Sequence, residues 1–202
     1  MDRFKEEMLQ ALETVKNIEG DFAEFGVFKG GSFVKLAPIA KEQKKPLHAF
    51  DSFKGLAEPS KFDVSPTGIT AYPKGKFNVG GPQSLINEMN SLGFVQDKDY
   101  FIWAGYVPEI FDKAPKDIKF SFCYIDLDHY LPTKHALEWT WNKMDKGSVV
   151  LCDDYNPSRV GGSASKAIYE FTEGKKADID IINTSNWVNY NWHPKQIAWR
   201  RK

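Results

Sequence analysis

Segments that read as β-strands alternate along this chain with segments that read as helices, and this alternation restricts the fold more than any other feature. The strand segments are short and rich in aromatic and β-branched residues; they cover 21–28, 46–53, 100–104, 119–127 and 148–151, with a final pair at 179–183 and 196–199. Apolar side chains at helical spacing mark 4–18, 33–40, 83–92, 108–112, 132–144 and 164–171. The pattern predicts an α/β fold with right-handed crossovers and a central, mostly parallel sheet covered by helices on both faces.

The length of 202 residues suits one domain, residues 1–202, with an N-terminal helix within 1–19. The chain has 27 Lys and Arg against 27 Asp and Glu, which argues against a general nucleic-acid binder, because such a protein needs uncompensated cations. Its charged first residues do not read as a secretory signal, and no apolar run is long enough for a membrane span. Two unclustered Cys favour the reducing cytoplasm.

Two segments do not fit the alternation. Residues 55–82 carry several Pro and Gly and no helical period, which predicts a long loop that serves as a lid or as the wall of an acceptor site. Residues 183–194 carry Trp and Tyr among several Asn and predict an aromatic flap. Both segments are candidates for substrate recognition.

Acidic residues gather where the predicted strands end. Asp51 follows the second strand, Asp126 and Asp128 follow the fourth, and Asp153 and Asp154 follow the fifth. The carboxyl ends of parallel strands meet at one edge of a sheet, so these side chains should lie close together and repel one another unless a cation compensates them. Oxygen ligands suit Mg²⁺ or Ca²⁺. Asp126, Asp153 and Asp154 are therefore candidate metal ligands, with capping of the following helices as the alternative.

The turn after the first strand carries a second group of candidates. Gly26 and Gly30 allow a ligand to approach the backbone, and Ser32 is a good N-cap for the helix that follows. The turn is not the dinucleotide fingerprint, because Val27 and Phe28 stand where that motif needs small residues. At the end of the second strand, the Asp51 carboxylate could accept from both hydroxyls of a ribose or could simply organise its own turn.

Candidate proton acceptors and thiols complete the polar inventory. His129 would be well matched to general-base work at neutral pH, and Asp128 is the alternative. Cys123 and Cys152 fall on adjacent predicted strands, and no basic group stands beside either in the sequence, so they are expected to be apolar fillers.

Four motifs of this chain resemble those of the macrocin O-methyltransferase family. They are Glu24–Ser32, Phe50–Leu56, Tyr124–Tyr130 and Asp153–Tyr155, in the family's order. The resemblance implies a Rossmann-like class I methyltransferase with a seven-stranded sheet, which uses S-adenosylmethionine and Mg²⁺ to methylate a hydroxyl of a sugar or another small polyhydroxylated metabolite.

The resemblance also implies roles for individual residues. It implies cofactor contacts from Glu24, Phe25, Gly26, Gly30, Ser32, Asp51, Ser52, Gly105 and Asp126. It implies that Asp126, Asp153 and Asp154 hold the metal, and Asp126 and His129 are the expected catalytic residues. The expected partner is a small glycosylated or polyhydroxylated acceptor, without nucleic acid or membrane, and the first helix could form a homodimer interface.

The sequence departs from the family pattern in three places. Val107-Pro108-Glu109 follows the turn after the third strand, where the family usually has a Thr-Leu-Pro type sequence. Leu131-Pro132-Thr133 stands where the family usually has Glu-Ser-Thr, and residues 55–95 lack the His that is the family's proposed base. The base is therefore open, as are three alternatives: a metal-independent methyltransferase acting on another nucleophile, a nicotinamide or nucleotide-binding Rossmann enzyme, and a cofactor-binding module without activity.

Overall fold

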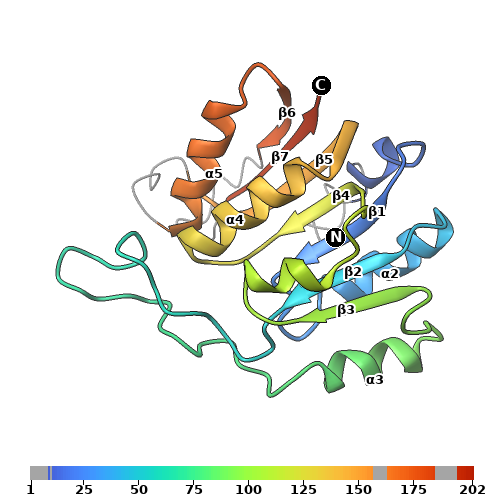
Figure 1. Ribbon diagram of the computed structural model, residues 1–202, viewed down its shortest axis with the longest axis horizontal. Coiled ribbons are helices and arrows are strands. Elements are labelled where there is room, and N and C mark those ends of the chain that lie inside the picture. Colours follow the sequence, from blue (N-terminus) through green and yellow to red (C-terminus); the bar gives the residue numbers. More distant parts are fainter. Residues whose placement is uncertain (1–8, 10, 157–162, 185–194) are drawn as a thin grey trace.

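The computed structural model describes residues 9, 11–156, 163–184 and 195–202, and a seven-stranded sheet runs through its centre (Figure 1). The strand order is β3-β2-β1-β4-β5-β7-β6. The first five strands in this order are parallel, and β7 is antiparallel to both β5 and β6. The strands are β1 (Asp21–Phe25), β2 (Leu47–Asp51), β3 (Tyr100–Ala104), β4 (Phe120–Ile125), β5 (Met144–Tyr155), β6 (Ile179–Thr184) and β7 (Lys195–Arg201). The predicted mostly parallel seven-stranded sheet is confirmed.

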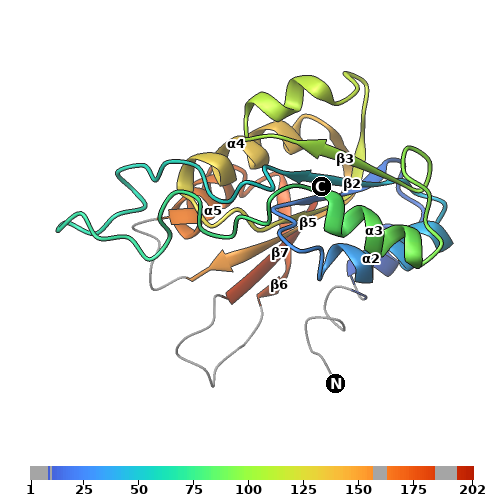
Figure 2. The ribbon, with the colours of Figure 1, turned by 90° about the horizontal axis from the view of Figure 1, so that it is seen from below.

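Successive residues of a strand point to opposite faces of the sheet, so both faces carry apolar side chains. Helices cover each face and bury them. The helices are α2 (Phe33–Glu42), α3 (Gln83–Ser91), the 3-10 helix η1 (Glu109–Lys113), α4 (Tyr130–Trp141) and α5 (Ser163–Gly174). On β1, Phe22 packs into one apolar cluster with α2 and α3, whereas Ala23 and Phe25 pack into the other with η1, α4 and α5. Figure 2 shows α2 and α3 on one side of the sheet and α4 on the other. The two clusters make a three-layer core.

The observed boundaries differ from the expected ones at a few points. β1 ends at Phe25 because Gly26 adopts φ 85, outside the extended backbone conformation of a regular strand. β5 is longer than expected, since it pairs with β4 at Met144 and with β7 at Tyr155. Of the expected first helix, residues 9 and 11–14 are helical, and residues 1–8 and 10 lie outside the described residues, as does most of the predicted aromatic flap.

The segment 55–82 is a long loop, as predicted, and contains neither helix nor strand. Figure 1 shows it reaching outward from the carboxyl ends of the parallel strands. It is anchored near its base, where Lys54 and Asn78 form an isolated β-bridge. The loop therefore borders the edge of the sheet where the sequence places the acidic residues.

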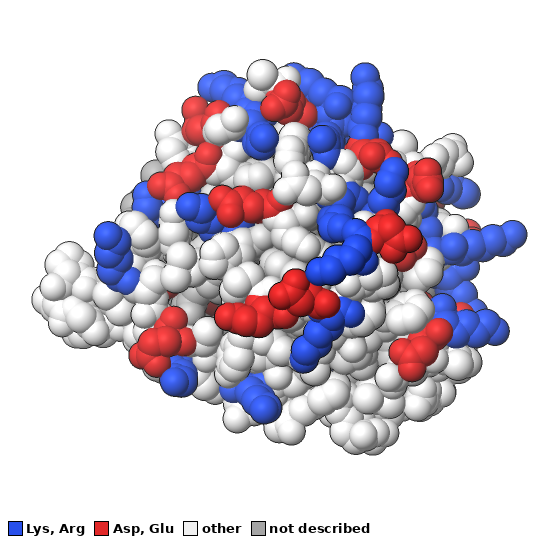
Figure 3. All heavy atoms as spheres, in the orientation of Figure 1, with Lys and Arg blue, Asp and Glu red and all other residues white. Residues whose placement is uncertain are grey.

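The charged surface residues and the two cysteines lie as the composition predicts. On the face shown in Figure 3, acidic and basic side chains are interspersed. Cys123 and Cys152 are both free and fully buried on neighbouring strands, which confirms them as core residues. Among the described residues, no helix is both long enough and apolar enough to span a membrane.

Candidate active site

A pocket of about 270 Å³ opens at the carboxyl ends of β1, β2, β4 and β5. Its lining combines carboxylates with aromatic and small residues. The polar and glycine members are Gly26, Asp51, Ser52, Gly55, Gly105, Asp126, Asp128, His129, Asp153 and Asp154; the apolar members include Phe28, Phe50, Leu56, Ala57, Phe77, Tyr106, Val107, Leu127 and Pro132. This is the edge at which open parallel sheets bind their ligands.

The turn after β1 brings the backbone close to the end of β4. A Cβ at Gly26 would lie 1.7 Å from the carbonyl oxygen of Asp126, so only glycine fits there. Glu24 is fully buried, and its Oε1 accepts a 2.5 Å hydrogen bond from Ser32 Oγ, while Oε2 has no partner among the described residues. Burial raises the pKa of Glu24 to about 8, because the charged form is poorly solvated.

Ser32 stands at the N-cap position of α2 but does not cap the helix with its side chain. Its hydroxyl donates to Glu24 instead, so the predicted capping role is wrong. A buried carboxyl group that otherwise lacks a donor competes with the helix terminus for this hydroxyl. The serine thereby becomes part of the Glu24 site.

Asp51 organises the turns around it. Its Oδ2 accepts from the backbone N–H groups of Val27 at 2.6 Å and Phe28 at 2.9 Å, and its Oδ1 accepts from Phe53 N–H at 2.5 Å. Asp51 therefore organises its own turn, which is one of the two roles that the sequence suggested for it. A carboxylate has about four acceptor positions, so Asp51, which also lines the pocket, retains room for a ligand hydroxyl.

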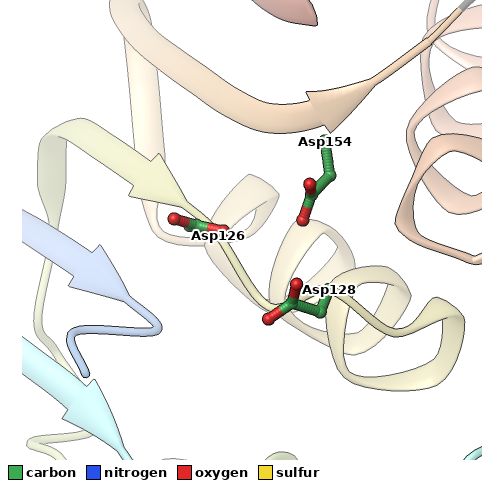
Figure 4. Close-up of side chains that lie close together, drawn as sticks. All are labelled: Asp126, Asp128 and Asp154. Carbon is green, nitrogen blue, oxygen red and sulfur yellow. The ribbon is translucent and has the colours of Figure 1, made fainter. Parts of the chain in front are cut away.

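Three carboxylates converge on one space in the pocket. Asp126 follows β4, Asp128 lies in the turn before α4, and Asp154 belongs to β5. One oxygen from each lies within 4.8 Å of the others, and Figure 4 shows the side chains around a common space. Asp128 and Asp154 have left-handed backbone, with φ 59 and 58. Neighbouring strands therefore supply a site with three oxygen donors.

The electrostatics of this cluster are unfavourable in the absence of a cation. Burial, followed by repulsion from Asp153 and Asp154, raises the pKa of Asp126 well above its usual value. Burial and the Asp128 charge raise the pKa of Asp154. Burial raises the pKa of Asp128 to about 6, against the lowering effect of His129 and Lys76. Asp154 Oδ2 has no hydrogen-bond partner among the described residues.

The third metal ligand predicted from the sequence is Asp153. It lines the pocket, but the cluster of converging oxygens consists of Asp126, Asp128 and Asp154. The side chains of Gln196 and Tyr124 hydrogen-bond to Asp153. Asp153 nevertheless lies near the cluster, since its charge helps to raise the pKa of Asp126.

His129 is nearly fully buried at the N-terminus of α4 and lines the pocket. Its Nε2 lies 2.8 Å from the carbonyl oxygen of Tyr72. A carbonyl can only accept, so Nε2 carries the hydrogen and Nδ1 is the basic nitrogen of the neutral ring. The histidine thus connects the long loop to the acidic cluster.

Further contacts of the loop were not signalled by the sequence. Asp63 Oδ1 accepts from Tyr130 N–H at 2.8 Å, at the first turn of α4, and Asp63 Oδ2 accepts from Ser60. Ser163 N–H donates to the carbonyl of Phe62 at the start of α5. Asp63 lies 67 positions before the residue that it caps, so no local sequence pattern indicates this contact. The loop is therefore bound to both helices that flank the cluster.

Of the remaining predicted cofactor residues, some line the pocket and others lie in the core. Ser52 and Gly105 line the pocket, where Ser52 Oγ donates to the Gly55 carbonyl. Phe25 lies in the core, stacked on Phe50 with ring centroids 4.7 Å apart, and is not among the described lining residues. A Cβ on Gly30 would meet Leu85, which shows that this glycine serves the packing of the turn.

The arrangement fits a cofactor with an ammonium group and a divalent cation. Glu24, on β1, presents an unpartnered buried oxygen, and Asp51, whose charge acts on Glu24, presents further acceptor positions in the pocket. The Asp126, Asp128 and Asp154 oxygens match the hard, oxygen-ligated character of Mg²⁺. The donors expected for both groups are therefore present.

Comparisons with known proteins agree with this geometry. The family model for macrocin O-methyltransferase matches residues 1–193. No curated protein matches the chain by sequence. The calicheamicin methyltransferase CalS11, a TDP-rhamnose 3′-O-methyltransferase, has 23% sequence identity and a TM-score of 0.71, with 96% of this chain and 78% of that chain covered.

Two further solved structures have the same fold. The O-methyltransferase NovP has 19% identity and a TM-score of 0.76, with 98% of this chain and 79% of that chain covered. An O-methyltransferase from Bacillus cereus, solved with S-adenosylhomocysteine, has 13% identity and a TM-score of 0.61, with coverages of 98% and 80%. Since the family model covers nearly the whole chain, the protein belongs to the macrocin O-methyltransferase family and is an S-adenosylmethionine-dependent O-methyltransferase of the class I fold.

Proposed function

We propose that this enzyme transfers the methyl group of S-adenosylmethionine to a hydroxyl of a sugar or another small polyhydroxylated metabolite, with Mg²⁺ as a second cofactor, in the cytoplasm. The supporting observation is the cluster of Asp126, Asp128 and Asp154 oxygens within 4.8 Å of one another, in a pocket beside the turn after β1. Carboxylates this close repel one another, and a divalent cation relieves that repulsion.

The cofactor would be held at the ends of β1 and β2. Glu24 pairs with the ammonium group of the methionine part, since its Oε2 is buried and lacks a partner. Asp51 accepts from the ribose hydroxyls, and Gly105 lets the adenine approach the end of β3. Bound S-adenosylmethionine supplies an electrophilic methyl group on a sulfonium centre. The chain binds and orients the cofactor so that this methyl group faces the carboxylates.

The metal would be held by Asp126 and Asp154, which come from the neighbouring ends of β4 and β5. Asp153, stabilised by Gln196 and Tyr124, would support this pair. A divalent cation held there would supply a Lewis acid that makes an acceptor hydroxyl easier to deprotonate.

Asp128 is the better placed of the two proton acceptors. Its carboxylate oxygen lies with the oxygens of the metal-binding pair, where the reacting hydroxyl would stand. His129 is held by the Tyr72 carbonyl through Nε2, so we assign it to positioning the turn that carries Asp128. The acceptor would enter between the loop 55–82 and the turn after β1. A sugar acceptor agrees with the activity of CalS11 on TDP-rhamnose.

Calorimetric titration with S-adenosylhomocysteine, with and without Mg²⁺, tests cofactor and metal together. We expect binding in both cases and tighter binding or a separate Mg²⁺ isotherm when the metal is present. Failure of the wild-type protein to bind S-adenosylhomocysteine would contradict the cofactor assignment.

Two matched variants separate ligand from base. Asp126→Asn should weaken Mg²⁺ binding, whereas Asp128→Asn should bind Mg²⁺ nearly as the wild type does and turn over about 100-fold more slowly, since general-base catalysis contributes at least that factor. Loss of Mg²⁺ binding in Asp128→Asn would make Asp128 a metal ligand and leave His129 as the base.

A further inference from the structure

β5 and β7 pair irregularly at the point where β5 carries two consecutive aspartates. The regular pairing stops at Cys152 and resumes at Tyr155. Between these positions β5 has two residues, Asp153-Asp154, whereas β7 has one, Gln196. Two residues that face one residue of the partner strand form a β-bulge, and bulges next to active sites redirect side chains.

The packing of β5 shows the effect of the bulge. Cys152 belongs to the apolar cluster that contains α4 and α5, and Tyr155 packs against the same cluster. In a regular strand, residues three positions apart would point to opposite faces. The backbone of Asp154 is left-handed, with φ 58, and accommodates the extra residue. The bulge therefore allows two consecutive carboxylates, Asp153 and Asp154, to line one pocket.

Donors from both neighbouring strands hold the first of these carboxylates. The side chains of Gln196, on β7, and Tyr124, on β4, hydrogen-bond to Asp153. Gln196 is 7% exposed and Tyr124 is 3% exposed, and in such surroundings a hydrogen bond is electrostatically stronger than in water. The backbone N–H of Asp154 donates to the same carboxylate. Asp153 thus links Gln196 to the backbone of Asp154, whose own carboxylate belongs to the cluster of three oxygens.

These contacts give Gln196 a role in the site. We infer that Gln196 is a positioning residue for the metal: it holds Asp153, and Asp153 in turn holds the backbone of Asp154 in the conformation that directs its carboxylate to the cation. Groups that hydrogen-bond to the surroundings of a metal orient the ligands and tune the affinity for the ion. The inference rests on the proposed function, since it concerns the Mg²⁺ site proposed for Asp126 and Asp154.

The affinity for Mg²⁺ alone tests this role without knowledge of the acceptor. Gln196→Leu removes the donor and keeps a side chain of similar size, so it should weaken Mg²⁺ binding to the full-length protein about tenfold, as measured by calorimetry. Affinity for S-adenosylhomocysteine without Mg²⁺ should not change, because the proposed cofactor residues Glu24 and Asp51 lie on other strands. Gln43→Leu is the matched control: it removes a bond of the same kind, to the Leu12 carbonyl at the end of α2, and should leave Mg²⁺ binding unchanged.

A second background shows whether Gln196 acts through Asp153. In the metal-free protein, Gln196→Leu should lower Tm when Asp153 is present and should not lower it in Asp153→Ala, where the acceptor of the bond is already absent. Gln196→Leu should likewise cause no further loss of Mg²⁺ affinity in Asp153→Ala. If Asp153→Ala does not fold, Asp153→Asn serves as the background, and the effects of Gln196→Leu should be smaller there. Tyr124→Phe removes the other side-chain donor and should also weaken Mg²⁺ binding.

Either of two results would overturn the inference. One is an equal Mg²⁺ affinity in Gln196→Leu and Gln43→Leu, and the other is the same loss of Tm from Gln196→Leu with and without Asp153. A wild-type protein that does not bind Mg²⁺ would instead contradict the proposed metal. The comparison of Tm values in the metal-free protein would still decide whether Gln196 holds Asp153.

Discussion

The carboxylates at the edge of the sheet are held in two opposite ways. Asp51, at the end of β2, accepts three backbone hydrogen bonds. Asp154, on β5, has an oxygen without any partner in the described structure, and burial and neighbouring charges raise its pKa. The difference is the supply of donors. Where the backbone provides N–H groups, an acidic residue organises a turn, and where it does not, buried acids need a cation.

Glu24 stands between these extremes. One oxygen accepts from Ser32, and the other is buried without a described partner. Its environment suits a single ammonium group rather than a divalent ion, because the carboxyl group lies apart from the cluster of three oxygens. The edge therefore offers a structural carboxylate, a carboxyl group that we propose for the cofactor and a cluster that we propose for the metal.

Removing a member of the cluster should have the largest effect. Asp126→Asn should lower Mg²⁺-dependent turnover about 10³-fold, since metal catalysis supplies several kcal/mol. The same change should raise the stability of the metal-free protein at pH 8, because one of the repelling charges is gone. Steady-state kinetics and urea unfolding measure the two effects. If Asp126→Asn turned over at the wild-type rate, the proposed difference between the structural Asp51 and the carboxylates of the cluster would be wrong.

Glu24 predicts a dependence of stability on pH. Its pKa in the folded protein is raised from 4.5 to about 8, chiefly by burial. The folded state therefore holds the proton more tightly than the unfolded chain. The stabilising contribution is full below pH 4.5 and is lost as the pH rises to about 8, by on the order of 4 kcal/mol.

Glu24→Gln removes this titration. In urea unfolding of the metal-free and cofactor-free protein at pH 5 and pH 8, the variant should lose less free energy of unfolding between the two values than the wild type. An identical loss in both proteins would show that Glu24 is ionised when buried.

Asp51→Ala should act mainly on folding. Three N–H groups lose their acceptor, and the free energy of unfolding should fall by about 2 to 3 kcal/mol. Asp112→Ala is the control, because Asp112 is exposed and makes only an ion pair with Lys116 on the surface. Thermal or chemical unfolding measures the change. If Asp51→Ala were as stable as the control, the turn would not depend on this carboxylate.

Asp63→Ala should have the smallest effect on stability, about 1 to 2 kcal/mol, since it removes the cap of α4. Turnover should fall as well, because the turn with Asp128 and His129 leads into this helix. Asp63→Asn keeps one acceptor oxygen for Tyr130 N–H and should recover the part of both losses that comes from the cap, but not the bond from Ser60 N–H, which an amide nitrogen cannot accept. Unfolding and kinetics measure the two effects. Equal behaviour of Asp63→Ala and Asp63→Asn would count against a capping role for Asp63.

The order of elements could be predicted from the sequence because each strand and helix has a local pattern. β3 was expected at residues 100–104 and is found at Tyr100–Ala104. The same pattern places acidic residues at the carboxyl ends of the strands, which sufficed to expect a carboxylate cluster with Asp126 and Asp154. Membership of the macrocin O-methyltransferase family follows from motifs of the same kind.

Other features depend on tertiary contacts and have no local pattern. Which member of Asp153-Asp154 faces the cluster depends on the register of β5. The capping of α4 by Asp63, the bond between His129 and the Tyr72 carbonyl, and the pairing of Phe28 with Phe77 each join segments that are far apart in the chain. Ser32 differs from these, because Glu24 is only eight positions earlier, but the burial of Glu24 that overrides the capping preference of Ser32 is again a tertiary property.

The central claim is that Asp126 and Asp154 hold a divalent cation beside Asp128. The most direct measurement is thermal unfolding of the cofactor-free protein at pH 7.5 during titration with Mg²⁺, in the wild type, Asp126→Asn and Asp154→Asn. We predict a saturable rise in Tm for the wild type, which both variants lose. No rise in the wild type, or the same rise in all three proteins, would contradict a metal site at these residues.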